Sequence, residues 1–61
     1  MLLHELLQYT FSNISLYIEK AIGEYETVFT GNKKDIPEKY LYMNVSGFFA
    51  SKNDLIEIEI Y

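Results

Sequence analysis

The stretch from Lys33 to Ile60, KKDIPEKYLYMNVSGFFASKNDLIEIEI, carries the strongest structural signals in the chain. It reads as a helix start, a short helix, a strand, a tight turn and a last strand in which apolar and acidic residues alternate strictly. Alternation of period two places the isoleucines of that last strand on one face and its glutamates on the other. One face therefore holds Ile56, Ile58 and Ile60, and the opposite face holds Glu57 and Glu59.

The helix within this stretch has its own start signals. Asp35 precedes it, where a carboxylate can accept backbone N–H groups and face the positive end of the helix. Pro37 suits the first helical position, because its missing N–H has no hydrogen bond to lose there. Glu38 adds a favourable charge in the first turn, and the helix is expected to end near Met43. Its expected anchors to the core are Ile36, Tyr40 and Leu41.

The remaining segments follow the same rules of spacing. Leucines at helical intervals predict a short amphipathic helix over residues 2–9. Alternation predicts a strand over residues 13–20, and Gly23 marks a turn because it adopts positive φ at little cost. Tyr, Thr, Val and Phe predict a second strand over residues 25–30, with Val28 inward and Phe29 partly covered. The third and fourth strands are expected at 45–50 and 55–60, joined by a turn at 51–54.

These elements predict one small α+β domain over residues 1–61, in the order α-β-β-α-β-β. We expect a four-stranded antiparallel sheet covered by two short helices, with a strand order that the sequence leaves open. The core is expected to consist of the inward apolar residues of every element. They are Leu3, Leu6, Leu7, Ile14, Leu16, Ile18, Val28, Ile36, Leu41, Val45, Ile56 and Ile58.

Charge narrows the classes of partner. The formal net charge is −4, and all five basic residues are lysines, so bidentate recognition of phosphate or guanine by arginine is missing. We therefore expect no direct binding of nucleic acid, although an acidic chain can meet a basic protein surface. No apolar run approaches the roughly 20 residues of a membrane span. The first residues lack a basic n-region and a cleavage site, so we expect a cytoplasmic protein without membrane contact.

The chain offers little for catalysis or for holding a cofactor. It has no cysteine and one histidine, His4, and it has no glycine-rich phosphate motif, so no metal or cofactor is predicted. Glu57 and Glu59 would lie about 7 Å apart on one strand face, which acid–base chemistry can use, but a solvated strand face explains them more simply. Lys33 and Lys34 read as solvated loop charges. We predict no catalytic residues and expect a protein that is not an enzyme.

Aromatic residues are more numerous than so small a core can enclose, with six tyrosines and four phenylalanines. Phe48 and Phe49 are consecutive, so in a strand they point to opposite faces and one of them leaves the core. Tyrosine and other aromatic residues are enriched at protein interfaces. We therefore predict a protein-binding surface that includes Tyr17, Tyr40, Tyr42, Phe48 and Phe49. The alternative is that the short helices cover this face.

The segments DIPEKYL, VSGFFA and LIEIEI, in this order, resemble a group of very small acidic proteins encoded by phages and prophages of Gram-positive bacteria. The likeness covers most of the chain, and its motifs are capping and strand signals without catalytic residues. The N-terminal half departs from that pattern through a longer polar turn at residues 20–24. The resemblance implies a protein of a mobile element, and some such proteins inhibit a host defence protein by binding it.

Two functions follow as hypotheses. The first is a non-enzymatic protein-binding module, in line with the surplus aromatic residues and the acidic charge, and with anti-defence activity as its specific form. The second is a structural or self-assembling phage accessory protein that forms a homo-oligomer, because an aromatic face can be covered by a second copy as well as by a foreign protein.

Overall fold

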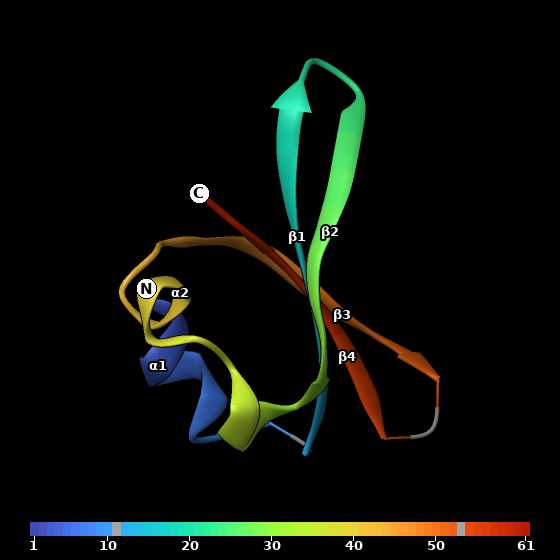
Figure 1. Cartoon of the computed structure of the whole chain (residues 1–61). Helices are drawn as coiled ribbons and strands as arrows, with labels where there is room; N and C mark the ends of the chain where they lie inside the picture. The colour runs from blue at the N-terminus through green and yellow to red at the C-terminus, as the bar shows by residue number, and fades with distance from the viewer. Residues whose placement is uncertain (11, 53) are drawn as a thin grey trace.

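The computed structural model describes residues 1–10, 12–52 and 54–61 of the chain. The predicted order of helices and strands is confirmed, and one short 3₁₀ helix is added between the second strand and the second α-helix. The elements are α1 Leu3–Leu7, β1 Asn13–Ala21, β2 Glu24–Asn32, η1 Lys33–Asp35, α2 Glu38–Leu41, β3 Val45–Lys52 and β4 Leu55–Ile60. Both α-helices lie on the same side of the sheet (Figure 1).

The sheet has four strands in the order β2-β1-β4-β3. The two hairpins β1–β2 and β3–β4 are antiparallel, but β1 and β4 run parallel, with Leu16 opposite Ile58. The prediction of a wholly antiparallel sheet is therefore wrong at the central pair. The two strands with strictly alternating Ile and Leu occupy the centre, where neighbouring strands on both sides protect their apolar residues best.

The core lies between the helices and one face of the sheet. Ile14 and Leu16 of β1 and Ile58 and Ile60 of β4 are entirely buried, because their strands are central and the helices cover this face. The other buried apolar residues are Leu3, Leu6, Leu7 and Ile36. Five predicted core residues are only partly buried and pack against this cluster, namely Ile18, Val28, Leu41, Val45 and Ile56. Ile60 was expected to point inward and is one of the most buried side chains.

The segment between β2 and α2 departs from the predicted helix start. Asp35 belongs to η1 instead of capping α2, and the side chain that caps this region is Asn32, whose Oδ1 accepts the Lys34 N–H at 3.0 Å. Pro37 is the residue before α2 rather than its first residue. The helix is shorter than predicted because the chain turns back toward β3 after Leu41.

Lys33 is not a solvated loop charge, contrary to the prediction. Its Nζ donates to the carbonyl oxygens of Leu7 at 2.8 Å and Thr10 at 3.1 Å. Carbonyls at the end of a helix have no partner within the helix and carry partial negative charge, so an ammonium group is a suitable donor. Lys33 therefore ties the end of α1 to the segment that follows β2, whereas Lys34 is exposed.

The β1–β2 hairpin extends beyond the rest of the sheet (Figure 1). β4 pairs with β1 only as far as Tyr17, so the outer part of β1 has β2 as its one neighbouring strand among the described residues. Gly23 at the tip has φ +80°, which confirms the predicted glycine turn. Ile22 beside it is fully exposed.

The β3–β4 turn is shorter than the predicted 51–54 segment. β3 continues through Lys52, and Asp54 adopts φ 64°, a left-handed conformation that aspartate tolerates in turns. Residue Asn53 of the predicted turn lies outside the described residues.

Candidate functional site

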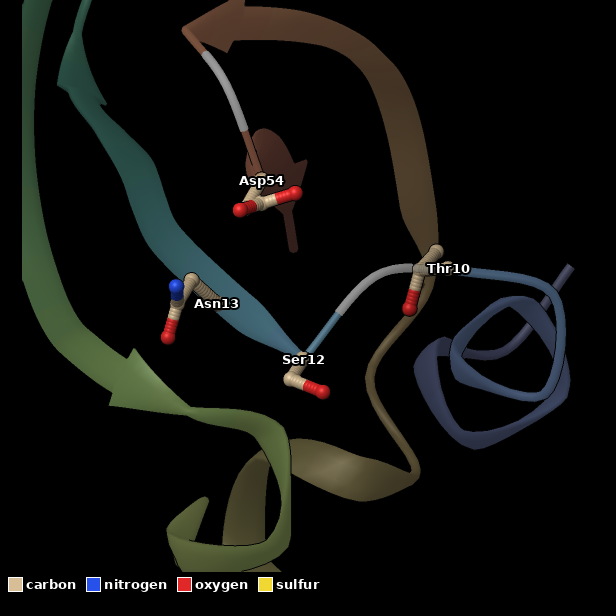
Figure 2. A pocket seen from close by; sticks show the side chains of 4 residues that line it. All are labelled: Thr10, Ser12, Asn13 and Asp54. Carbon is tan, nitrogen blue, oxygen red and sulfur yellow. The ribbon is translucent and has the colours of Figure 1, made fainter.

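One hollow of about 480 Å³ lies where β1 begins, beside the β3–β4 turn (Figure 2). It is lined by Thr10, Ser12, Asn13 and Asp54, and it is open to solvent. Ser12 and Asn13 are consecutive, and Figure 2 shows their side chains pointing away from each other. The polar groups around the hollow therefore do not converge on a single ligand atom.

The chemistry of this hollow is also limited. Thr10 donates its hydroxyl to the Leu7 carbonyl at 3.1 Å, so that group already has a partner. Asp54 is the one acidic side chain in the lining, and the lining contains no histidine or lysine that could act as its proton partner. No nucleophile–base pair is formed by these four residues.

Neither a metal-binding cluster nor a membrane-spanning helix occurs in residues 1–10, 12–52 and 54–61, the part of the chain that the structure describes. Within these residues, no group of three or more His, Cys, Asp or Glu side chains lies close enough to hold a metal ion. Within the same part of the chain, no helix is both long and apolar enough to cross a membrane.

The sheet face opposite the helices is the more distinctive surface, and neither α-helix lies over it (Figure 1). Strand register defines which side chains share this open face, because residues directly opposite one another point the same way. The open face consists of Asn13, Ser15, Tyr17 and Glu19 of β1, Tyr25, Thr27, Thr30 and Asn32 of β2, Gly47, Phe49 and Lys52 of β3, and Leu55, Glu57 and Glu59 of β4.

Two half-buried carboxylates lie at the middle of the open face. Glu57 and Glu59 belong to the central strand β4, with Glu59 opposite Tyr17 on one side and opposite Gly47 on the other. Neither carboxylate forms an ion pair or a side-chain hydrogen bond with a described residue, and the ion pair seen in this part of the chain joins Lys20 to Glu26 at 3.8 Å. The middle of the open face therefore carries two carboxylates that no described lysine approaches within ion-pair distance, although Lys52 lies on the same face at the end of β3.

The pKa of Tyr17 responds to this negative charge. Its partial burial, followed by the nearby carboxylates of Glu59 and Glu57 and by Tyr25, raises the pKa of the Tyr17 phenol, because each disfavours a further negative charge. The ring of Tyr25 lies edge-on to the ring of Tyr17, with centroids 5.6 Å apart and an interplanar angle of 76°. Such edge-to-face contact is a preferred geometry of aromatic pairs.

The aromatic residues predicted for partner binding lie on different surfaces. Tyr17 and Phe49 share the open face, on opposite sides of the two carboxylates. Phe48 lies on the helix side of the edge strand β3 and is 53% exposed. Tyr40 packs against the core from α2. Tyr42 is exposed, and its ring lies 5.3 Å from the ring of His4.

Tyr25 belongs to the open face but was not among the predicted binding residues. Strand pairing in the hairpin places Tyr25 on this face, because Tyr25 lies opposite Glu19 of β1 and diagonal to Tyr17. The sequence predicts Val28 inward and Phe29 partly covered; both side chains are half-buried against the core, but it is Phe29 that lies opposite Leu16. A register shift between Leu16 and Tyr17 explains why, since this β-bulge interrupts the alternation of β2 and leaves both Val28 and Phe29 half-buried.

The acidic residues do not gather on one side of the molecule. Glu57, Glu59 and Glu19 share the open face, and the Glu19 carboxylate accepts the Gly23 N–H at 3.0 Å. The remaining six are spread over α1, η1, α2, the β2 strand and the β3–β4 turn, namely Glu5, Glu24, Glu26, Asp35, Glu38 and Asp54.

The candidate site is accordingly the open face, where tyrosine and phenylalanine rings flank two unpaired carboxylates on a central strand that is paired on both sides. Ser15 lies opposite Glu57 and Tyr17 opposite Glu59 in the β1–β4 pair, but the Ser15 hydroxyl is hydrogen-bonded to that of Thr30, and no described side chain donates a hydrogen bond to either carboxylate. The chain matches no protein-family model, no curated protein and no solved structure.

Proposed function

We propose that this chain is a non-enzymatic protein-binding module whose open face binds a cationic segment of another protein. The observation that carries the proposal is the pair of half-buried carboxylates, Glu57 and Glu59, which have no cationic partner among the described residues. A lysine or arginine side chain of a partner would supply the missing charge. Complementary charge accelerates association and selects among partners.

The rings beside the carboxylates fit the same partner. Tyr17, Tyr25 and Phe49 provide aromatic area around the negative charges, and aromatic residues dominate the binding energy of many interfaces. A cation over an aromatic ring gains about 0.5–2 kcal/mol, more when it is shielded from water. The Tyr17–Tyr25 contact holds both rings in place before binding, so less conformational freedom is lost on association.

Gly47 shapes the surface next to Glu59. It lies opposite Glu59 in the β3–β4 pair, and a Cβ atom added to it would meet nothing within 4 Å. The absence of a side chain at this position gives a partner residue access to the Glu59 carboxylate from the β3 side. The resemblance to small phage proteins suggests a host protein as the target, with inhibition of a defence protein as the specific case.

The binding face can be tested with defined peptides before a target is known. Lysine-rich and arginine-rich peptides, with neutral and acidic peptides of equal length, are titrated into isotopically labelled protein while backbone amide shifts are followed by NMR. We expect cationic peptides to shift the amides of β1 and β4 around Tyr17 and Glu59, and added salt to weaken the effect because the contact is electrostatic.

A pair of charge-matched variants separates this face from net charge. Glu57→Gln/Glu59→Gln should weaken binding of the cationic peptides at least about tenfold. Glu24→Gln/Glu26→Gln removes the same charge from β2, so it should change binding little. Equal loss in both double variants, or peptide-induced shifts centred on the hairpin tip, would contradict the proposal.

A further inference from the structure

The outer edge of β3 is covered at its start and free beyond it. The Leu3 N–H donates to the Met43 carbonyl at 2.9 Å, and the Val45 N–H donates to the Met1 carbonyl at 2.8 Å, so the first residues of the chain cover this edge as far as Val45. From Ser46 to Lys52, β3 is an edge strand whose only pairing partner among the described residues is β4. Unpaired N–H and C=O groups of an edge strand can pair with another strand.

The two edges of the sheet differ in their protection. β2, at the opposite edge, carries Glu24 and Glu26 and faces an interruption of register opposite Leu16 and Tyr17. Charged residues and bulges are the usual means by which proteins block pairing at an edge. β3 has no charged residue between Val45 and Ser51, and its first charge is Lys52 at the end of the strand. Only the β3 edge is therefore chemically open to another strand.

Two phenylalanines project from this free edge. Phe48, on the helix side of the sheet, is 53% exposed and is not among the residues packed on the core, because the short helices do not reach it. Phe49, on the open face, is 52% exposed. Neighbouring them on the strand are the small residues Gly47 and Ala50. An identical strand could approach this segment without meeting a like charge.

We propose that the β3 edge pairs antiparallel with the β3 edge of a second copy of this chain, about a two-fold axis at Phe48. A two-fold axis perpendicular to the sheet keeps each face continuous, so a residue on it faces itself. With Phe48 on the axis, Gly47 of each copy lies opposite Phe49 of the other, on the open face. The Phe49 ring then covers the empty space above Gly47, where an added Cβ would meet nothing within 4 Å.

The alternative axis at Phe49 fits less well. It would place Gly47 opposite Ser51, which leaves the space above Gly47 empty, and Phe48 opposite Ala50. The Phe48 axis pairs Ser46–Ala50 of one copy with the same segment of the other, and the pairing ends there because Met1 already pairs at Val45, which Ser51 of the partner would otherwise face. Both phenylalanines are buried by this register, one pair on each face of the continuous eight-stranded sheet.

The contact is expected to be weak. A fully buried phenylalanine covers about 150–250 Å², so four half-exposed rings contribute roughly 300–500 Å², and stable interfaces bury about 1,200 Å² or more in total. Backbone pairing over five residues adds to this. We expect a dissociation constant on the order of 10⁻⁵ to 10⁻³ M.

Self-association is measured on the purified chain alone by sedimentation equilibrium between about 10 µM and about 1 mM, across the expected dissociation constant. The mass should rise from monomer to dimer, and Phe48→Lys should weaken the dimer at least about tenfold, because like charges then lie directly opposite each other. Ile22→Lys is the matched control: it places the same charge on another exposed apolar residue, at the hairpin tip, and should leave the dimer intact. Circular dichroism of both variants checks folding.

The register has its own test, because the chain contains no cysteine. In the proposed pairing two Cys residues introduced by Phe48→Cys face each other about 4.5–5.5 Å apart between Cα atoms, within disulfide range. Two introduced by Ala50→Cys lie about 13 Å apart and should not crosslink. A monomer at every concentration, an equal effect of Ile22→Lys, or preferential crosslinking of the Ala50→Cys variant would overturn the proposal. The dimer contact covers Gly47 and Phe49 of the open face, so it competes with a partner at the β3 side of Glu59. Sedimentation of the chain alone measures the dimer and peptide titration measures the binding face, so either proposal can fail without the other.

Discussion

Individual side chains of β1 and β4 carry most of the core. Ile58 has no solvent exposure. It lies in the central strand β4, opposite Leu16 of β1 on one side and Phe48 of β3 on the other. A core of this size supplies a net stability of only about 3–5 kcal/mol. Burial of a single side chain therefore contributes a large part of the net free energy of unfolding.

Ile58→Asp should unfold the chain, because the carboxylate would be buried without a partner. Ile58→Ala, which removes only volume, should lower the free energy of unfolding by about 2–5 kcal/mol. Thermal and denaturant melts followed by circular dichroism measure both. The control Ile22→Asp makes the same chemical change at a fully exposed position and should alter stability by no more than about 0.5 kcal/mol. A cooperative melt of Ile58→Asp at the wild-type temperature would refute the placement of Ile58.

The raised pKa of Tyr17 predicts that the free energy of unfolding depends on pH in the alkaline range. Partial burial and the carboxylates of Glu59 and Glu57 raise its pKa in the folded state above the ordinary value near 10 that it has when unfolded. The stabilisation from the neutral phenol is therefore fully present below pH about 10 and is lost as the pH rises through the folded pKa. Stability should fall over this range, and less so in Tyr17→Phe.

Absorbance titration of the phenolates separates Tyr17 from the other tyrosines by the difference between the wild type and Tyr17→Phe. Glu59→Gln should lower the pKa of Tyr17 toward its ordinary value, because one of the nearby negative charges is gone. Glu24→Gln, on β2, removes an equal charge that does not act on Tyr17 and should leave the titration unchanged. An unshifted Tyr17 titration in Glu59→Gln would mean that the carboxylate does not act on the ring.

At the scale of elements, short helices depend on contacts made outside themselves. α1 spans Leu3–Leu7, too short to be stable alone, and its two ends are held by side chains. The Glu5 carboxylate accepts the Leu2 N–H at 2.8 Å at the start. The Lys33 ammonium binds the Leu7 and Thr10 carbonyls at the end, from a segment far along the chain.

Lys33→Met should lower the free energy of unfolding by about 1–2 kcal/mol, because two partly buried carbonyls lose a charged donor while the aliphatic part of the side chain is kept. Denaturant unfolding measures the difference. Lys34→Met makes the identical change at the exposed neighbouring residue and should cost no more than about 0.5 kcal/mol. Equal losses in the two variants would show that the effect is one of net charge and not of the α1 contact.

Secondary structure was predicted well because each element is encoded locally. Periodicity located α1, β1 and β4, start signals located α2, residue type located β2, and Gly23 located the hairpin turn. The errors lie in the segment after β2, which forms hydrogen bonds with residues far from it in the sequence. Asn32 and not Asp35 provides the side-chain cap, and Lys33 binds α1 instead of water, since both depend on how the chain after β2 packs beside α1.

On the scale of the whole molecule, strand pairing is uneven along β1. Residues 13–17 lie between β2 and β4, whereas the outer part of the hairpin has pairing on one side only in the part of the chain that the structure describes (Figure 1). Local opening should therefore cost less free energy in the outer hairpin than in the centre of the sheet.

Hydrogen exchange followed by NMR should find the paired amides of residues 19–26 exchanging faster than those of Ile14, Leu16 and Ile58. The comparison uses hydrogen-bonded amides of the same sheet, two of them in the same hairpin, which controls for the effect of pairing alone. Equal protection along the full length of β1 would mean that the hairpin opens only with the whole domain.

The arrangement of the two hairpins is the main feature that local signals did not contain. Each hairpin is antiparallel as predicted, yet the hairpins meet through the parallel pair of β1 and β4. The same arrangement leaves β3 at the edge with Phe48 and Phe49 half-exposed, and it places Glu59 beside Tyr17. Of the residues predicted for partner binding, it brings Tyr17 and Phe49 to one face and leaves Phe48, Tyr40 and Tyr42 elsewhere.

Sequence alone was sufficient for the α+β class, the order of the elements and the inward-facing isoleucines of β4, because propensity and period two act within a few residues. Only the tertiary structure decided which strands are central, which edge is free and which charges lie beside which rings. Those features depend on contacts between residues far apart in the chain, and many strand orders are compatible with the same local pattern. The unpaired carboxylates of the open face and the free edge of β3 both follow from the strand order β2-β1-β4-β3.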